Sequence, residues 1–446
     1  MKKNQHIAIA GAGLVGSLLA IYLAKRGYRV EVFERRHDMR SQVLDGGRSI
    51  NLALSNRGIR ALEEVGLAEP LRATAIPMHG RAMHNLKGEI TKQPYGKEGQ
   101  FINSISRSGL NAVLMDRAEA LGVRFHFNQR VVQVNLDTTT LTLQQNDTEK
   151  TLTFDRIIGA DGAFSSIRLA MQFTDRFDLS QDYIEHGYKE LHIPAGAGGT
   201  FQLEKNALHI WPRESFMMIA LPNPDGSFTC TLFFPFEGAK SFAALKTADE
   251  INTFFKTTFP DAVALMPDLL TDYREHPTGS LVTIKCFPWI KNKTLVIGDA
   301  AHAIVPFYGQ GMNAGFEDCH ILNQLLDQYH DDWERALPAF QSQRKKDTDA
   351  IAKLALDNFI EMRDLVADAD FLLRKKIEAR LHELYPTQWI PQYSMVTFHE
   401  NIPYSQAYAL GQKQKRIMDE VMQRPDIATT WQTLDFQQLV RRIQEA

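Results

Sequence analysis

Cysteine is scarce in this chain, with three residues among 446. Cys230, Cys286 and Cys319 are far apart and odd in number, so they predict neither a disulfide framework nor a zinc site. Free thiols are usual in a reducing compartment, and the cytoplasm is therefore the simplest expected location.

Long apolar runs and a clear excess of one charge are also missing. No stretch approaches the roughly 18 consecutive apolar residues of a membrane-spanning helix, and residues 1–6 lack the apolar core of a signal peptide. The 50 basic and 53 acidic residues give a net charge of -3, which provides no electrostatic basis for nucleic-acid binding. We expect a globular protein of two or three domains, without a transmembrane segment, and the sequence allows a homodimer.

The N-terminal residues predict a complete βαβ unit with a glycine-rich turn after its first strand. The strand, the helix and the second strand are expected at 7–10, 17–26 and 28–33. Gly11 allows a sharp bend, Gly13 lets a pyrophosphate approach the backbone, and Gly16 lets the helix pack closely on the strand. Glu34 follows about 20 residues after the turn, where a carboxylate accepts hydrogen bonds from ribose hydroxyls. The whole pattern predicts dinucleotide binding.

Two later glycine motifs distinguish the dinucleotide. Asp161-Gly162 and Gly298-Asp299 each follow a predicted strand, at the end where ligands of open α/β sheets bind. The carboxylate of Asp299 can accept a hydrogen bond from a ribityl hydroxyl. Gly311, Met312 and Asn313 begin a predicted helix, so their N–H groups can meet the negative charge of a reduced isoalloxazine. These features favour FAD.

The remaining chain is predicted to change from α/β to β-rich and then to helical. The expected elements are helices at 59–65 and 111–121, strands at 123–127, 131–134 and 157–158, a hairpin at 138–154, an antiparallel sheet within 183–285, and helices from about 313 onward, including 358–366 and 371–384. Phe436, Leu439, Val440 and Ile443 share one face of a last helix. That helix could bind a membrane surface or a partner, but we favour packing on its own domain because its polar face carries both charges.

The three ordered motifs resemble those of the single-component flavin aromatic hydroxylases, the para-hydroxybenzoate hydroxylase-like group. The resemblance implies an α/β fold with a Rossmann-like FAD-binding domain, an inserted antiparallel-sheet substrate domain and a C-terminal helical region. Only one dinucleotide fingerprint is present, which suits a group in which NADPH is a transient co-substrate. The expected segments are the FAD-binding domain at 1–75, 101–182 and 286–345, the substrate domain at 76–100 and 183–285, and the helical region at 346–446.

Longer segments are similar to the branch of this group that hydroxylates L-kynurenine. These segments are 47–58, 188–191, 209–213, 228–232 and 298–319. The branch resemblance implies that the chain converts L-kynurenine to 3-hydroxykynurenine with NADPH and O2, through a flavin C4a-hydroperoxide, in tryptophan degradation and NAD precursor synthesis. The substrate's amino group already activates the ring carbon that is attacked, so we assign no catalytic base and no metal. Animal members carry a hydrophobic C-terminal anchor, whereas this chain ends in an amphipathic segment.

The resemblance also assigns the substrate residues. Arg81 and Tyr95 match the pair that binds the substrate carboxylate, for which a guanidinium fork suits the planar anion. Asn358 and Tyr393 match further polar contacts, and Tyr308 lies at a position that varies within the branch. The apolar pocket positions are Leu208, Met217, Ile219, Phe233, Phe307 and Met362. Without the resemblance, Arg81 would be interpreted as a surface ion-pair residue and the apolar side chains as ordinary core.

The cofactor residues come from the motifs and from the same resemblance. They are Gly11, Gly13, Val15, Gly16, Glu34, Arg36, Ala53, Arg107, Val131, Asp299, Gly311, Met312 and Asn313. Arg107 precedes a predicted helix and can reach the FAD phosphates. Two alternatives stay open at this point: hydroxylation of another aromatic substrate on the same fold, and a flavoprotein that senses or docks with little turnover.

Overall fold

The computed structural model describes residues 5–41, 51–362 and 369–445, and it centres on a six-stranded sheet. In order across this sheet, the strands are β18 (Ile290–Lys291), β19 (Thr294–Val296), β12 (Arg156–Gly159), β1 (His6–Ala10), β2 (Arg29–Phe33) and β8 (Arg124–His126). All neighbours are parallel except β18 and β19. Strands from three distant parts of the sequence therefore share one sheet. The predicted βαβ unit is confirmed, with α1 (Leu14–Lys25) between β1 and β2.

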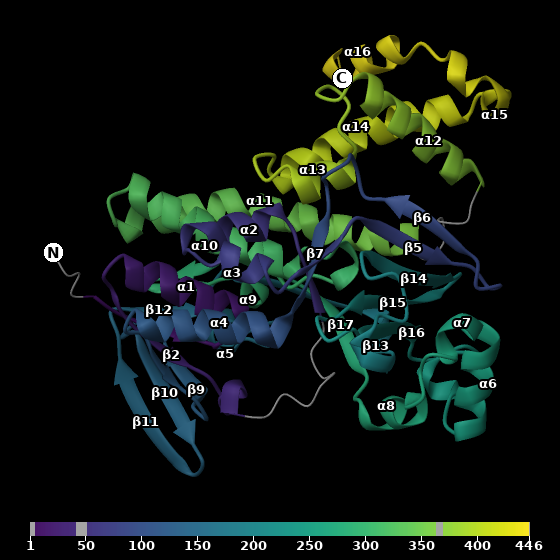
Figure 1. Cartoon of the computed structure of the whole chain (residues 1–446). Helices are drawn as coiled ribbons and strands as arrows, with labels where there is room; N and C mark the ends of the chain where they lie inside the picture. Colours follow the sequence, from purple (N-terminus) through teal and green to yellow (C-terminus); the bar gives the residue numbers. More distant parts are fainter. Residues whose placement is uncertain (1–4, 42–50, 363–368, 446) are drawn as a thin grey trace.

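Helices and a small sheet surround the six strands (Figure 1). The helices are α1, α4 (Arg107–Ala120), α5 (Ser166–Gln172), α9 (Asp299–His302) and α10 (Gly311–Gln328). The small sheet contains β9 (Arg130–Asn135), β10 (Thr140–Gln145) and β11 (Thr148–Thr153). The hairpin expected at 138–154 is thereby confirmed, and Leu141 lies opposite Leu152 in it. Buried Ile, Leu and Val side chains of strands and helices together form the largest core cluster.

The second large sheet of the molecule has seven strands. In order across this sheet, its strands are β17 (Gly279–Phe287), β13 (Asp178–Ile193), β16 (Phe228–Pro235), β15 (Phe216–Pro222), β14 (Ala207–Arg213), β5 (Gly80–His84) and β6 (Ile90–Pro94). Its neighbours are antiparallel except β14 and β5. A fourth sheet contains β3 (Asn51–Leu54), β7 (Ile102–Ser106) and β4 (Ile76–Met78), and β7 runs directly into α4.

Three helices, which were not predicted, lie within the stretch that was expected to be β-rich. These are α6 (Ala248–Thr258), α7 (Pro260–Val263) and α8 (Leu269–Glu275). They cover one face of the seven-stranded sheet, where Phe255 and Leu269 join Trp211 in a buried cluster. A local signal was present, because Thr247 and Glu250 form a reciprocal capping box at the start of α6. The many aromatic residues of the neighbouring strands favoured a β-rich interpretation of the whole stretch.

Helices make up the C-terminal part of the chain (Figure 1). They are α11 (Trp333–Ile360), α12 (Ala369–Leu384), α13 (Gln392–Phe398), α14 (Tyr404–Met422), α15 (Ile427–Thr430) and α16 (Phe436–Glu445), while α2 (Asn56–Glu64) and α3 (Ala68–Arg72) belong to the N-terminal part. Of the helix expected at 358–366, residues 363–366 lie outside the described residues. Leu439, Val440 and Ile443 of α16 are buried against α12 and α14, so the last helix packs on its own domain as expected.

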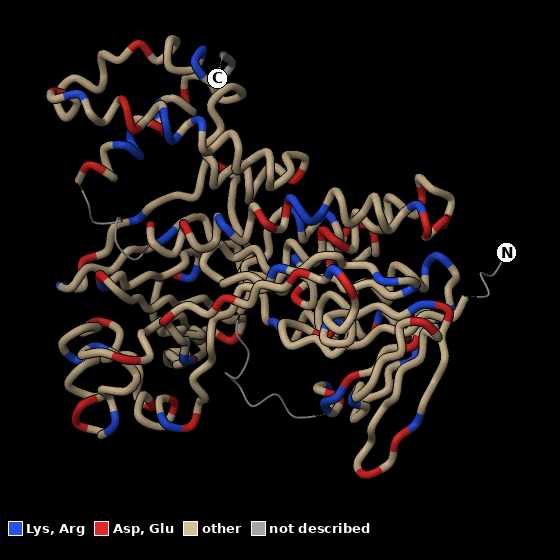
Figure 2. Tube along the Cα trace, turned by 180° about the vertical axis from the view of Figure 1, so that it is seen from behind, with Lys and Arg blue, Asp and Glu red and all other residues tan. Residues whose placement is uncertain are grey.

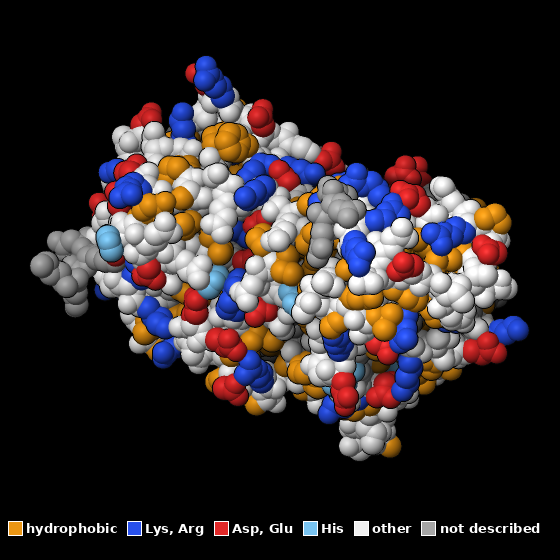
Figure 3. Space-filling view, turned by 90° about the horizontal axis from the view of Figure 1, so that it is seen from above, with side chains coloured by type: hydrophobic (Ala, Val, Ile, Leu, Met, Phe, Trp, Pro, Cys, Tyr) orange, Lys and Arg blue, Asp and Glu red, His pale blue; other side chains and the backbone are white. Residues whose placement is uncertain are grey.

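Charged residues of both signs are distributed over the whole described chain. Figure 2 shows Lys and Arg interspersed with Asp and Glu along the trace, and Figure 3 shows the same mixture on the upper surface. Among the described residues, no helix combines the length and the apolar character needed to cross a bilayer.

The small C-terminal core predicts a clear difference between two leucines of α12. Leu381 is fully buried, whereas Leu384 is 41% exposed. Leu381→Ala should lower the free energy of unfolding by roughly 2–5 kcal/mol, because it leaves a cavity. Leu384→Ala, on the same helix, should change it by less than about 1 kcal/mol. Urea unfolding followed by circular dichroism measures both values, and equal effects would contradict the packing of α12 against α14 and α16.

Candidate active site

The glycine turn after β1 has the geometry of a phosphate-binding loop. Gly11 has a φ of +99°, and a Cβ there would lie 2.5 Å from the carbonyl oxygen of Ala160. A Cβ on Gly16 would lie 2.0 Å from the Gly11 oxygen, so both positions require glycine. At Gly13, which caps α1, a Cβ would meet nothing within 4 Å. This open cradle lies at a helix N-terminus without a side-chain cap, and it fits the pyrophosphate of a dinucleotide.

Glu34 is positioned at the end of β2 beside this turn. Its carboxylate accepts hydrogen bonds from the N–H of Ala12 at 3.0 Å and from the backbone and side chain of Arg36, both at 3.0 Å. Burial alone would raise the pKa of Glu34, but the Arg36 charge and these hydrogen bonds outweigh it and lower the pKa. The side chain of Glu34 is therefore an ionised acceptor, as a ribose contact requires.

The two later motifs differ in what their carboxylates do. Asp161 accepts hydrogen bonds from the Ser165 hydroxyl at 2.5 Å and the Ser166 N–H at 2.7 Å, so it caps the start of α5. Burial raises the pKa of Asp161. Asp299, by contrast, is exposed at the carboxyl end of β19, where a ligand can reach it. Asp161 thus shapes the turn, and Asp299 is available to a ribityl hydroxyl.

Arg168 joins these two motifs, and the sequence analysis missed it. Its buried guanidinium donates hydrogen bonds to the carbonyl oxygens of Ala163 at 2.6 Å and Ala300 at 2.8 Å. Ala163 lies two residues after Asp161, and Ala300 directly follows Asp299. No local pattern marks an arginine that pairs with distant backbone oxygens, so this residue could not be found from spacing.

The N-terminus of α10 is fixed by the side chain of Asn313. This fully buried amide donates to the carbonyl oxygens of Ala53 at 2.8 Å and Gly309 at 2.9 Å, and it accepts from the Ser55 N–H at 3.0 Å. The Asn313 side chain is therefore occupied within the protein. The N–H groups at the start of α10 have no side-chain cap, which leaves them for a flavin.

The other proposed cofactor residues lie on several elements. Val15 packs against Gly298 and Gly315, where added Cβ atoms would lie 3.1 and 2.5 Å from its side chain. Arg107 is exposed at the first position of α4, and Arg36 is 68% exposed beside Glu34. Val131 is buried in β9.

Arg81 lies among three tyrosines at one end of the seven-stranded sheet. Its Cζ atom is 5.6 Å from the ring centre of Tyr95 and 5.0 Å from that of Tyr393, and Tyr393 stacks on Tyr308 at 5.4 Å. Within the described residues, Arg81 forms no ion pair with a carboxylate. Its Nε and the Tyr95 hydroxyl are buried without a hydrogen-bond partner there. Burial raises the pKa of Tyr95 well above its ordinary value, so its hydroxyl stays a neutral donor. A ligand carboxylate would satisfy both groups.

A cluster of apolar side chains adjoins this cation. Leu208 lies opposite Arg81 in the β14–β5 pair, so the two side chains share a face of the sheet. Met217 lies opposite Phe233, and Phe307 contacts the Phe233 ring edge-on at 4.9 Å. The structure gathers all six predicted apolar residues into one packed group, together with Tyr308 and Tyr393: Leu208, Met217, Ile219, Phe233, Phe307 and Met362.

Two details of this pocket differ from the sequence analysis. The Asn358 amide donates to the carbonyl oxygen of Phe307 at 2.6 Å and to the sulfur of Met362 at 3.2 Å. Its nitrogen therefore already has hydrogen-bond partners within the protein. Phe359, which the sequence analysis did not select, stacks on Phe307 at 4.1 Å.

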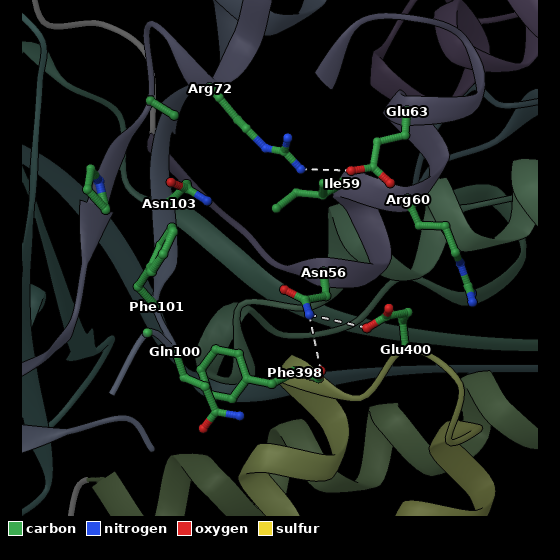
Figure 4. A pocket seen from close by; sticks show the side chains of 13 residues that line it. Asn56, Ile59, Arg60, Glu63, Arg72, Gln100, Phe101, Asn103, Phe398 and Glu400 are labelled. Carbon is green, nitrogen blue, oxygen red and sulfur yellow. Dashed lines mark hydrogen bonds and ion pairs between the residues drawn. The ribbon is translucent and has the colours of Figure 1, made fainter. Parts of the chain in front are cut away.

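A separate surface pocket of about 590 Å³ lies beside the sheet of β3, β7 and β4 (Figure 4). Pro77 and Asn103 line it, whereas their neighbours Met78 and Ile102 face the tyrosine cluster on the other side. None of the sequence-predicted site residues lines this pocket. Its polar side chains include Asn56, whose amide bonds the Phe398 carbonyl at 3.1 Å.

Comparisons with known proteins agree with this geometry. A family model described as an FAD binding domain matches residues 4–346. Kynurenine 3-monooxygenase of Flavobacterium psychrophilum is 50% identical over 442 residues, which cover 98% of each chain. The enzyme of the same name from Myxococcus xanthus is 51% identical, covering 94% of this chain and 91% of its own length. The chain belongs to the kynurenine 3-monooxygenase family. Its cofactor is FAD.

Members of this family are not confined to bacteria, and the fold extends further still. The kynurenine 3-monooxygenase of Dictyostelium discoideum is 45% identical, covering 95% of this chain and 94% of its own length. The solved 2-methyl-3-hydroxypyridine-5-carboxylic acid oxygenase superimposes with a TM-score of 0.67 at 22% identity, covering 82% of this chain and 94% of that one. The latter similarity concerns the fold alone and confirms the predicted fold class.

Two glycine substitutions should separate folding from FAD binding. Gly11→Ala places a Cβ against Ala160 at a positive φ, so it should lower the melting temperature even of FAD-free protein. Gly13→Ala meets open space, so it should preserve that melting temperature but weaken FAD binding at least about tenfold. Thermal unfolding and FAD titration measure these effects. FAD binding by Gly13→Ala as tight as wild type would rule out the open cradle as the pyrophosphate site.

Proposed function

We propose that the protein hydroxylates L-kynurenine to 3-hydroxykynurenine, using NADPH as the reductant and O2 as the oxygen donor. The observation that carries the proposal is Arg81, which has no acidic partner among the described residues and lies beside a cluster of aromatic and apolar side chains. L-kynurenine has the matching two ends, an amino-acid carboxylate and an aminophenyl ketone. The family membership supports the same substrate.

Each part of the pocket has a defined task in this reaction. The Arg81 fork and the neutral hydroxyls of Tyr95 and Tyr393 bind the substrate carboxylate. Phe307 and Phe233 pack against the aminophenyl ring and exclude water, so that the ring is held in one orientation. Bound FAD accepts the hydride and activates oxygen. The substrate's amino group activates its own ring, so no side chain must remove a proton first.

The remaining sequence expectations are part of the proposal. Asp299, Glu34 and the start of α10 are the proposed FAD contacts, and the segment boundaries given above are the proposed domains. All three cysteines are free and buried, which suits a reducing cytoplasm. The sequence also allows a homodimer.

Removing the Arg81 charge should abolish the preference for a substrate with a carboxylate. A hydrogen-bonded charged group contributes about 1.5–3 kcal/mol, so Arg81→Met should lower kcat/KM for L-kynurenine roughly 10- to 100-fold. The ratio of kcat/KM between L-kynurenine and kynurenamine, the same aminophenyl ketone without a carboxylate, should fall by a similar factor. NADPH oxidation and chromatography of the hydroxylated product measure both rates.

The wild-type protein supplies the control for this experiment. It should oxidise NADPH much faster with L-kynurenine than without it and should yield the 3-hydroxy product. Peroxide as the only product would favour a flavoprotein with little turnover, and faster turnover of another aromatic acid would favour a different hydroxylase. An unchanged substrate ratio in Arg81→Met would show that the carboxylate binds elsewhere.

A further inference from the structure

Arg57 is a fully buried arginine on α2, and its donors reach the end of a distant helix. Its Nε donates to the carbonyl oxygen of Val396 at 2.9 Å. Its Nη2 donates to the carbonyl oxygens of Ile402 at 2.5 Å and His399 at 3.3 Å. One guanidinium therefore holds several oxygens at and beyond the C-terminus of α13.

These oxygens belong to groups that a helix cannot satisfy by itself. The last four carbonyls of an α-helix lack internal partners, and a positive charge near them interacts favourably with the helix dipole. Asn56, the residue before Arg57, bonds a further one, the carbonyl of Phe398, at 3.1 Å (Figure 4). The seven-residue helix α13 thus owes its C-terminal hydrogen bonding to two adjacent side chains of α2.

The helix held in this way carries a residue of the proposed substrate site. Tyr393 lies in the first turn of α13 and stacks on Tyr95 at 5.6 Å and on Tyr308 at 5.4 Å, with Arg81 beside it. A displacement of α13 would move the Tyr393 ring relative to Arg81.

The same guanidinium also contacts the helix that begins at the proposed flavin position. Its Nη1 pairs with the Glu317 carboxylate of α10 at 2.6 Å. Its face lies 4.0 Å from the ring centre of Tyr404, whose hydroxyl bonds Gln310 at 2.9 Å just before α10. Arg57 consequently fixes α13 relative to α10.

We propose that Arg57 is a positioning residue for substrate recognition: it holds α13 on α10 so that Tyr393 faces Arg81. The inference rests on the proposed function, because it assigns Arg57 to carboxylate recognition by that same site. Arginine is required, since only a planar fork with five N–H donors can bond Glu317 and several carbonyls at once. Lysine keeps the charge but has three donors on one nitrogen.

Arg57→Lys tests the proposal, with Arg213→Lys as its matched control. Arg213 is also buried, donates to the carbonyls of Thr258 at 2.6 Å and His84 at 3.0 Å, and lies over the Phe259 ring at 5.2 Å. Within the described part of the chain, its hydrogen bonds and ring contact involve neither α13 nor α10. Both variants should lose stability, but only Arg57→Lys should raise KM for L-kynurenine, by roughly 10- to 100-fold, with a smaller effect on kcat. Hydrogen exchange should accelerate at 392–398 in that variant alone.

A double substitution tests whether Arg57 acts through Tyr393. If it does, Arg57→Lys combined with Tyr393→Phe should raise KM little more than Tyr393→Phe alone, because coupled residues are not additive. Additive effects, or a KM as unchanged in Arg57→Lys as in Arg213→Lys, would overturn the inference. Failure of wild-type protein to hydroxylate L-kynurenine would instead overturn the proposed function.

A milder substitution keeps the inference testable if Arg57→Lys does not fold. Asn56→Ala removes the hydrogen bond to Phe398 and leaves Arg57 in place. It should raise KM in the same direction by a smaller factor and should accelerate exchange at 392–398. Unchanged KM and unchanged exchange in Asn56→Ala would contradict the role of this end of α2.

Discussion

Two adjacent buried carboxylates on α10, Glu317 and Asp318, hold the parts of the molecule together. Glu317 pairs with Arg57 at 2.6 Å and Arg344 at 2.7 Å, and Asp318 pairs with Arg344 at 2.7 Å and His302 at 2.5 Å. Burial alone would raise both carboxyl pKa values, but the neighbouring cations lower them, so both groups are ionised. Leaving such a charge unpaired costs about 3–5 kcal/mol. The three partners must therefore stay in place, and with them α2, α9 and α11.

One short segment, residues 53–57, connects the proposed flavin position with the proposed substrate site. The N-terminus of α10 presents its N–H groups to the flavin position, and Asn313 ties it to Ala53 and Ser55. Arg57 lies two residues after Ser55 in the sequence. Its Nε donates to a carbonyl oxygen of α13, the helix that carries Tyr393. Residues 53–57 therefore contact both sites, and a movement of one site would be transmitted to the other through a few hydrogen bonds rather than through the whole core.

The sequence was most informative where chemistry depends on local spacing. The glycines of the first turn, the hairpin at 138–154 and the amphipathic face of α16 follow from neighbouring residues, and the structure contains all three. Arg57, Arg168 and Phe359 were missed because their partners are backbone oxygens or rings far away in the sequence. Helix α6 was missed for another reason. Its capping box is a local sequence signal, but the neighbouring aromatic residues are typical of strands.

The pattern of arginine pairing itself argues for the substrate. Arg57, Arg168 and Arg344 are buried, and each donates to carboxylates or backbone carbonyls. Arg81 differs, because within the described residues it has neither a carboxylate nor a backbone carbonyl as a partner, and aromatic rings lie beside it. A protein that desolvates a cation without a partner accepts a cost in folding. A substrate carboxylate offsets that cost when it binds Arg81. An aminophenyl ketone without a carboxylate leaves the cost in place, so it should bind less tightly.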